Sequence, residues 1–376
     1  MYKRKIIRSV TVAKSIGFYL PFVQDLCNQG YEVVSLSSSG PELEKLRELG
    51  IKTIEVEMER KISPFKDFIS LFRLIKVFRR EKPYMVHSMT PKAGLLCMLA
   101  AWVVRVPRRV HTFTGLVWPT SVGITRKVLM FTDWLTCACA THVIPEGKGV
   151  MEDLKHITKK SMRVLGYGNV RGIDMQKFSH RKIIVDLARG IAKENIFTFL
   201  FVGRLVGDKG INELVDAFEK LYNEIGGVRL ILVGGHEADL DPLLPRTEKI
   251  INSCVAIESV GPKYGDELIV YYAASNCFVL PSYREGFPNV VMEAGAMELP
   301  SIVTDINGSR EIIENGKNGL IVPSKNSDAL YYAMKEVVLN KKQTELMMAN
   351  ARSMIANRFE QSFVKKCLLD FYDEIM

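Results

Sequence analysis

The most informative residues in the chain are two glutamates, Glu285 and Glu293, that share one short stretch. This stretch, PSYREGFPNVVMEAG at residues 281–295, follows the apolar run CFVL at residues 277–280. The apolar run predicts a buried strand, and Pro288 stands where a helix can begin. Open α/β folds bind ligands at such a strand–loop–helix corner, and two acids there suit the hydroxyls of a sugar or ribose. Alternatively, Glu285 caps the loop and Glu293 only complements the first turn of its helix.

A glycine-rich basic loop, GRLVGDKG at residues 203–210, follows another predicted strand at residues 197–203. Arg204 offers a planar set of donors, and Lys209 offers a compact positive charge. The glycines let the backbone approach a phosphate, and the N-terminus of the next helix favours an anion. The loop therefore predicts a site for a nucleotide diphosphate, with a solvated loop of incidental charges as the alternative.

The first half of the chain offers weaker candidates. His111 ends a predicted strand at residues 108–111, so we expect it to face a cleft, although a structural histidine is nearly as good an interpretation. Lys92 starts a predicted helix and is placed to meet a phosphate or to remain a solvated surface residue. Gly17 would let the backbone approach a diphosphate, or it is only a glycine at a helix start.

Predicted strands and helices alternate twice along the chain. The first series has strands at residues 6–10, 32–37, 52–56, 85–87, 108–111 and 141–145, and the second at 197–203, 229–234, 256–260, 277–280, 301–304 and 319–322. This alternation predicts two doubly wound α/β domains facing a cleft. We place the boundary at the glycine-rich loop of residues 166–178, which gives domains 1–178 and 179–359. We also expect one helix from Gly17 to about Gly30, and a last helix over residues 342–371.

The charge is unevenly divided between the two halves. Residues 1–178 hold 29 Lys and Arg against 15 Asp and Glu, a net charge of +14, whereas residues 179–376 hold 22 against 27. A basic half indicates an anionic partner, for which nucleic acid and an anionic membrane surface are the candidates. The helix predicted at residues 65–80 carries basic and aromatic residues, so it is a crossover helix packed on the sheet or an in-plane membrane contact.

Other classes are disfavoured by the composition. The seven cysteines contain no CxxC pair, which indicates reduced thiols in a cytosolic protein and no metal site. The longest apolar run, residues 95–104, is far shorter than the roughly 20 residues of a membrane-spanning helix. We therefore expect neither a signal peptide nor a transmembrane helix.

The motifs at residues 203–210, 281–295, 308–312 and 318–323 resemble those of glycosyltransferase family 4. These are retaining nucleotide-sugar transferases of the GT-B fold, which has two Rossmann-like domains facing a cleft. Residues 62–64, 87–94, 111–115 and 166–178 are similar to the branch that builds bacterial capsule, O-antigen and exopolysaccharide repeats. In that fold the last helix, here residues 360–376, returns to the first domain.

The resemblance assigns the donor-binding roles. It implies that Arg204 and Lys209 bind the diphosphate, that Glu293 holds the ribose, and that Glu285 holds the donor sugar as a catalytic residue. It also implies that the loop backbone near Phe287 and Asn289 contacts this sugar.

The resemblance is less complete in the first half. His111 matches a catalytic strand-end histidine of the family, which other members carry immediately before the glycine, where this chain has Thr114. Many members have two glycines and an acidic residue where this chain has only Ser15-Ile16-Gly17. Ser15 and Lys92 are then candidates for acceptor or phosphate contacts.

The implied function is transfer of a sugar, which we expect to be UDP-linked, to a polyprenyl-diphosphate-linked glycan in surface-polysaccharide biosynthesis. We expect no metal or other cofactor, and we expect a cytoplasmic protein, peripheral on the inner face of the plasma membrane through its N-terminal domain. One alternative is a nucleotide-sugar epimerase of the same fold. The other is a basic nucleic-acid-binding protein without enzymatic activity, although no recognisable nucleic-acid-binding module is present.

Overall fold

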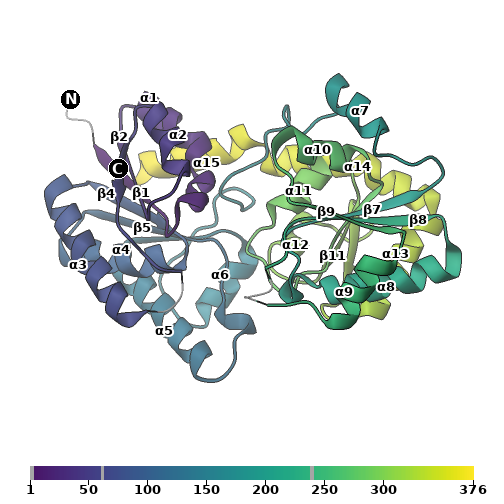
Figure 1. Ribbon diagram of the computed structural model, residues 1–376. Coiled ribbons are helices and arrows are strands. Elements are labelled where there is room, and N and C mark those ends of the chain that lie inside the picture. The colour runs from purple at the N-terminus through teal and green to yellow at the C-terminus, as the bar shows by residue number, and fades with distance from the viewer. Residues whose placement is uncertain (1–3, 61–62, 238–240) are drawn as a thin grey trace. The chain divides into compact units, whose positions relative to one another are not determined.

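The computed structural model describes residues 4–60, 63–237 and 241–376, which form two compact domains (Figure 1). The first domain comprises Met1–Gly172 and Gln361–Met376, and the second comprises Ile173–Glu360. The division falls before the predicted boundary at residue 178 because Ile173 and Phe178 are buried in the core of the second domain. The Arg352 guanidinium holds this segment by donating to the carbonyl oxygens of Met175 and Phe178, both at 2.7 Å.

The described part of the first domain contains a six-stranded parallel sheet in the order β3-β2-β1-β4-β5-β6. Its strands are β1 (Lys5–Ser9), β2 (Glu32–Ser37), β3 (Lys52–Glu55), β4 (Met85–Met89), β5 (Arg108–Phe113) and β6 (His142–Pro145). Successive residues such as Ile6 and Ile7 are both fully buried but belong to different hydrophobic clusters, because side chains alternate between the faces of a sheet. Both faces of this sheet are therefore covered.

The helices of the first domain form two layers around the sheet (Figure 1). On one face lie α1 (Val23–Asn28), α2 (Glu42–Glu48) and α15 (Gln361–Ile375). On the other lie α3 (Pro64–Glu81), α4 (Pro91–Val103) and α5 (Gly123–Cys139), followed by α6 (Lys148–Lys155). Short 3-10 helices occupy Ala13–Phe18, Leu20–Phe22 and Trp118–Thr120. The predicted helix from Gly17 is wrong in its first part, because Pro21 has no amide hydrogen to continue an α-helix and α1 begins only at Val23.

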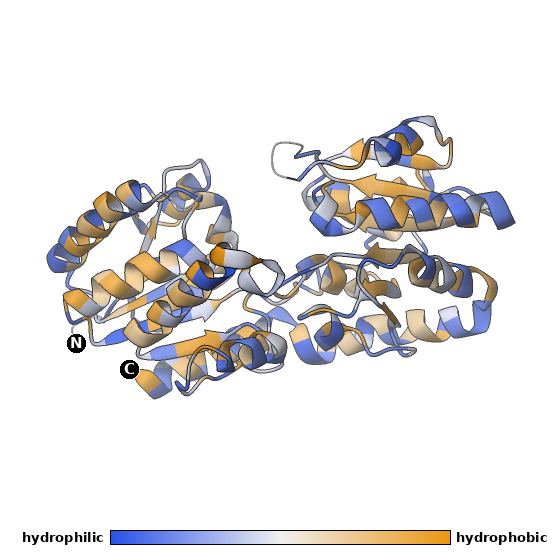
Figure 2. Ribbon diagram, turned by 90° about the horizontal axis from the view of Figure 1, so that it is seen from below, coloured by the Kyte–Doolittle hydropathy of each residue, from blue (hydrophilic) through white to orange (hydrophobic). Residues whose placement is uncertain are grey.

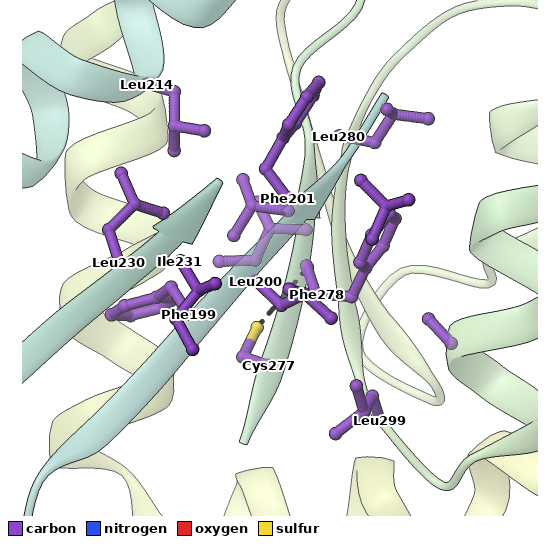
Figure 3. Close-up of a cluster of buried hydrophobic side chains, with 14 of the residues drawn as sticks. Phe199, Leu200, Phe201, Leu214, Leu230, Ile231, Cys277, Phe278, Leu280 and Leu299 are labelled. Carbon is purple, nitrogen blue, oxygen red and sulfur yellow. Dashed lines mark hydrogen bonds between the residues drawn. The ribbon is translucent and has the colours of Figure 1, made fainter. Parts of the chain in front are cut away.

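The second domain repeats the same topology in its described residues, with the strand order β12-β11-β10-β7-β8-β9. Its strands are β7 (Phe197–Val202), β8 (Val228–Val233), β9 (Ile257–Gly261), β10 (Cys277–Leu280), β11 (Ser301–Thr304) and β12 (Gly319–Val322). Figure 3 shows the centre of its core, where Phe199 and Phe201 of β7 lie near Phe278 of β10. The central strands β7 and β10 are largely apolar because helices cover both faces of a parallel sheet.

The helices of the second domain pack around this sheet (Figure 1). They are α7 (Lys182–Arg189), α8 (Ile211–Ile225), α9 (Pro245–Ser253), α10 (Gly265–Ala273), α11 (Asn289–Ala296), α12 (Ser309–Ile312), α13 (Ser327–Leu339) and α14 (Lys341–Phe359), with a 3-10 helix at Gly207–Lys209. The single helix predicted over residues 342–371 is instead two helices, because Glu360 adopts an extended backbone between α14 and α15. This break lets α15 pack on the first domain while α14 packs on the second.

Each sheet reverses its strand order at one place, between β1 and β4 in the first domain and between β7 and β10 in the second. Loops at the carboxyl ends of these neighbouring strands lie side by side, which is where doubly wound sheets bind ligands. Figure 2 shows the strands largely in orange and many helices striped in blue and orange, as expected for amphipathic helices around apolar sheets.

Candidate functional site

The two sequence motifs of the second domain meet at the β7/β10 reversal. The loop at residues 203–210 follows β7, and the loop at residues 281–288 follows β10. The Tyr283 amide donates to the carbonyl oxygen of Asp208 at 2.9 Å. Gly210 has a φ of +72°, and a Cβ at this position would overlap the carbonyl oxygen of Pro281. Only glycine therefore allows the two loops to pack this closely.

Lys209 and Glu285 are direct partners across this junction. The Lys209 ammonium donates to a carboxylate oxygen of Glu285, and their side chains are only 17% and 15% exposed. The residue predicted to bind a diphosphate and the residue predicted to hold a sugar therefore lie in one place. A bound anion at Lys209 would compete with Glu285 for the ammonium and leave carboxylate oxygens available to hydroxyl donors.

Arg204 lies in the same loop, and carboxylates orient its side chain. One guanidinium nitrogen donates to Glu237 at 3.0 Å, and the other lies 4.0 Å from Asp208. Arg284 of the facing loop also donates to Asp208, at 3.2 Å. Asp208 thus links the two loops, a role that the sequence motif did not reveal because the partner is 76 residues away.

Glu293 is buried in α11 near the same corner. The Tyr272 hydroxyl of α10 donates to its carboxylate at 3.1 Å. Burial, and then the charge of Glu293, raises the pKa of Tyr272 well above its usual value, so this hydroxyl remains a donor. Tyr272 is therefore a positioning residue for Glu293 that the sequence did not single out.

Phe287 and Asn289 border the sugar loop in different ways. The Phe287 ring is buried, with its centroid 5.3 Å from that of Phe359, so only its backbone is available to a ligand. Asn289 is the first residue of α11. Gly308 has a φ of +73°, and a Cβ there would overlap the carbonyl oxygen of Gly286. The turn before α12 therefore packs directly against the backbone of the sugar loop.

Tyr283 and two serines are further polar groups that the sequence analysis missed. The Tyr283 hydroxyl donates to Glu213 of α8 at 2.6 Å. Burial, followed by the hydrogen bond to Glu213, raises the pKa of Tyr283 far above its usual value. Within the described ranges, the buried hydroxyls of Ser282 and Ser309 have no hydrogen-bond partner. Their signal in the sequence was only their position within the motifs at residues 281–295 and 308–312.

His111 does not lie at an open strand end, so this expectation is wrong. Strand β5 continues to Phe113, and the alternation of side chains puts His111 on the face that α4 covers. Its ring is 1% exposed, its Nδ1 lies 2.8 Å from the Ser88 hydroxyl, and a Cβ on Gly94 would overlap it. Burial lowers the pKa of His111 to about 3. The structural interpretation of this histidine therefore fits its surroundings.

The other candidates of the first domain are not brought together. Lys92 at the start of α4 donates to both carboxylate oxygens of Asp67 in α3, at 2.7 and 2.9 Å. Ser15 and Gly17 lie in the 3-10 helix after β1, where a Cβ on Gly17 would meet nothing within 4 Å. The structure thus gives no steric reason for glycine at position 17.

Thr90 is a feature of the β1/β4 reversal that the sequence did not predict. It has a φ of +70°, which is a strained conformation for a β-branched residue. Its hydroxyl lies 2.8 Å from that of Thr11 and accepts from the Thr11 amide at 3.0 Å. These contacts tie the loop after β1 to the start of α4.

Residues 4–60, 63–237 and 241–376 contain no group of three or more His, Cys, Asp or Glu placed to hold a metal ion.

Two Rossmann-like domains with the same strand order are the architecture of the GT-B fold. Residues 10–130 match the family described as glycosyl transferase 4-like, and residues 187–354 match the family described as glycosyl transferases group 1. The chain belongs to glycosyltransferase family 4, as the sequence motifs predicted, and is a glycosyltransferase.

Two curated relatives match over most of their length. The capsular polysaccharide biosynthesis glycosyltransferase CapM of Staphylococcus aureus is 31% identical over 389 residues, covering 100% of this chain and 98% of CapM. The UDP-Gal:alpha-D-GlcNAc-diphosphoundecaprenol alpha-1,3-galactosyltransferase of Escherichia coli is 29% identical over 310 residues, covering 80% of this chain and 78% of that enzyme.

The likeness to solved structures confirms the predicted fold. The Anabaena protein HepE, solved in complex with UDP-glucose, has a TM-score of 0.81 and 17% sequence identity, covering 98% of this chain and 99% of HepE. At this identity the comparison concerns the fold alone.

Proposed function

We propose that the chain transfers a sugar from a UDP-linked donor to a polyprenyl-diphosphate-linked glycan in surface-polysaccharide biosynthesis. The observation that carries this proposal is the β7/β10 corner, where Lys209 contacts Glu285. Two relatives support the pathway, since one is named for capsular polysaccharide and the other for a diphosphoundecaprenol acceptor.

In the proposed donor complex, Arg204 and Lys209 bind the diphosphate, which withdraws Lys209 from Glu285. The carboxylate of Glu285 then holds hydroxyls of the donor sugar, while Glu293, fixed by Tyr272, holds the ribose. Positive charge at the diphosphate stabilises the negative charge that develops on the leaving group.

We propose transfer on the front face of the sugar with retention of its anomeric configuration, and without a covalent intermediate. The buried His111, with its pKa lowered by burial, takes no direct part in this scheme. The measurement is NMR analysis of the anomeric centre in the product, where an inverted linkage would refute retention.

Cationic side chains take the role that a metal ion has in other transferases, so we propose a metal-independent reaction. Activity is then expected to be unchanged in EDTA and after addition of Mg²⁺. Loss of transfer in EDTA that Mg²⁺ restores would overturn this part.

We propose that the basic first domain brings the enzyme to the anionic inner face of the plasma membrane, where a lipid-linked acceptor resides. No described helix is long and apolar enough to cross a membrane. Peripheral association is the arrangement consistent with this finding and with the charge of +14 on residues 1–178.

The experiment is incubation with a panel of nucleotide sugars and short-chain polyprenyl-diphosphate saccharides, with products identified by mass spectrometry. The proposal expects one donor to be consumed and free nucleotide to be released only when acceptor is present. Conversion of the donor without acceptor would instead identify an epimerase. Salt-sensitive binding of DNA or RNA without any binding of nucleotide sugars would identify the non-enzymatic alternative.

A further inference from the structure

The outward side of the α3–α4–α5 layer carries an unusual number of exposed aromatic side chains. Helix α4 packs against both α3 and α5, so the three helices form one continuous layer (Figure 1). We call its exposed aromatic residues the aromatic face, and each of them is between 44% and 78% exposed: Phe65, Phe68, Phe72, Trp102, Phe131 and Trp134. Exposed aromatic side chains gathered on one layer indicate an interaction site.

Helical spacing gathers these side chains. In α3, Phe65, Phe68 and Phe72 are three and seven positions apart, which puts them on one side of the helix. The rings of Phe68 and Phe72 meet edge to face with centroids 4.7 Å apart. In α5, the rings of Phe131 and Trp134 stack with centroids 5.6 Å apart.

The helix between them is apolar on every side. Helix α4 contains a single charged residue, Lys92, in its 13 positions. Its outward residues Leu95 and Leu99 are half-buried between the neighbouring helices, and Trp102 is exposed. A helix that is apolar all round normally lies in a core or against a nonaqueous surface. Helix α4, in the middle of the layer, therefore presents no polar side to solvent.

The charge on the same layer is one-sided. The three helices contain eight Lys and Arg against three Asp and Glu. None of these acids is exposed, because Asp67 is bonded to Lys92, and Glu81 and Asp133 are buried. Within the described ranges the exposed Lys76 and Arg79 form no salt bridge, and they continue the side of α3 that begins with Phe65.

A basic depression lies where α3 and α4 end. It has a volume of about 640 Å³, and its lining includes Arg79, Lys82 and Arg105, with Glu32 as its acidic member. Cations near helix C-termini are favourable in themselves, but here they line one open hollow. Such a hollow can accept the phosphate of a lipid headgroup.

We propose that the aromatic face docks on an anionic phospholipid bilayer, with its aromatic rings in the interfacial region and its cations on headgroup phosphates. This inference rests on the proposed function in that the acceptor is taken to be lipid-linked, so the domain must meet it at a bilayer. The helices run from the carboxyl edge of the sheet, so Phe65 lies near the edge that carries Thr11 and Thr90.

Charge argues against a second copy of the chain as the occupant. A two-fold interface would place the same cationic surface on both sides, and no exposed acid of these three helices would face it. An anionic bilayer complements both the charge and the apolar surface.

Tryptophan fluorescence provides a direct test, because two of the three tryptophans belong to the aromatic face and Trp118 is buried. Vesicles of phosphatidylglycerol and phosphatidylcholine are expected to shift the emission to shorter wavelength, and brominated lipids are expected to quench it. Replacing Phe68 and Phe72 by serine is expected to weaken partitioning by about tenfold or more, since the inserted apolar area is lost. Replacing Lys76 and Arg79 by serine is expected to cost about fivefold per cation on anionic vesicles only.

The matched control replaces Val255 and Tyr264, two exposed residues of the second domain, by serine. Its partitioning is expected to equal that of the wild type, and circular dichroism verifies that every variant is folded. Partitioning that does not depend on Phe68 and Phe72 would overturn the inference. So would a dimer in vesicle-free solution that the same double substitution converts to monomer.

Transfer assays separate this inference from the proposed function. The Phe68→Ser/Phe72→Ser variant is expected to keep transfer to a water-soluble short-chain acceptor and to lose transfer to the same saccharide on a vesicle-embedded lipid. Vesicle binding without transfer to any acceptor would refute the function while supporting the docking surface. Transfer to both acceptors at wild-type rates would refute the docking surface alone.

Discussion

The contact between Lys209 and Glu285 brings together two proposed binding groups for the donor. The ammonium of Lys209 suits the diphosphate, and the carboxylate of Glu285 suits the hydroxyls of the sugar. Replacing Lys209 by alanine leaves the Glu285 carboxylate without this cation and exposes the incoming diphosphate to its negative charge. We expect kcat/KM for the donor to fall by about 10²–10³, in the range seen when an electrostatic catalytic group is removed.

The matched control for this variant is Lys220→Ala, because Lys220 lies on the surface of the same domain and pairs with Asp328. Steady-state kinetics over a range of donor concentrations measures both variants. Equal activities would show that Lys209 has no part in donor binding.

Asp133 gives a pH dependence of stability that is independent of catalysis. Burial raises the pKa of Asp133 from its usual 3.8 to about 7, so the folded protein binds a proton that the unfolded chain has released at neutral pH. The stabilising contribution of this neutral carboxyl is complete below about pH 4 and is lost as the pH rises through about 7.

Asp133→Asn removes the cost of ionising a buried carboxyl at high pH without changing the shape of the side chain. We expect the variant to be more stable than the wild type at pH 8, by on the order of 2–4 kcal/mol, and nearly equal to it at pH 4. Thermal unfolding across this pH range measures the difference, with Asp186→Asn on the surface as the control. A constant difference at all pH values would contradict the assignment.

At the residue scale, the sequence was most informative for side chains in loops that directly follow a predicted strand. Glu285 and Lys209 were predicted together because each follows a strand of the same sheet. The sequence left open whether His111 faces a cleft or is structural, because its burial depends on Gly94 of a different element. The pairing of Lys92 with Asp67 was missed because the two residues belong to different helices.

At the element scale, the junction of the two loops depends on one glycine. Gly210→Ala places a side chain at positive φ and against the carbonyl oxygen of Pro281, so the loops must separate. We expect transfer to fall at least about 100-fold and the melting temperature to decrease. Gly190→Ala is the control, because Gly190 ends α7 at negative φ. An active Gly210→Ala enzyme would show that the junction is not required.

The elements themselves were largely predictable. Each predicted strand overlaps an observed one, and the central strands were clearest because parallel strands covered on both faces are rich in apolar residues. Helix ends were less predictable, since Pro21 and Glu360 interrupt segments whose composition is otherwise helical. The sequence left two interpretations of α3 open, a crossover helix or an in-plane membrane contact, because its aromatic residues resemble those of a buried helix.

At the scale of the whole molecule, the end of the chain completes the first domain. The Tyr372 hydroxyl of α15 accepts from Arg8 of β1 at 2.8 Å and lies 2.5 Å from Nδ1 of His87. Burial, and then the charge of Arg8, lowers the pKa of His87 well below its usual value, so the ring is neutral. Residues from both ends of the sequence therefore share one buried polar network.

Tyr372→Phe removes the oxygen that serves Arg8 and His87. We expect a loss of about 1–3 kcal/mol, the cost of leaving buried polar groups without a partner. Urea denaturation followed by tryptophan fluorescence reports on this domain, because all three tryptophans lie in it. Tyr332→Phe, at an exposed position of the second domain, is the control. No difference between these variants would show that the network does not stabilise the first domain.

We propose that the β7/β10 corner of the second domain binds and activates a sugar donor. The most direct measurement is the rate of sugar transfer by Glu285→Gln beside Glu336→Gln, which alters an exposed acid on α13 of the same domain. We expect Glu285→Gln to remain folded and to lose about 10²–10³ in kcat/KM, while Glu336→Gln matches the wild type. A folded Glu285→Gln enzyme that transfers sugar at the wild-type rate would contradict the account.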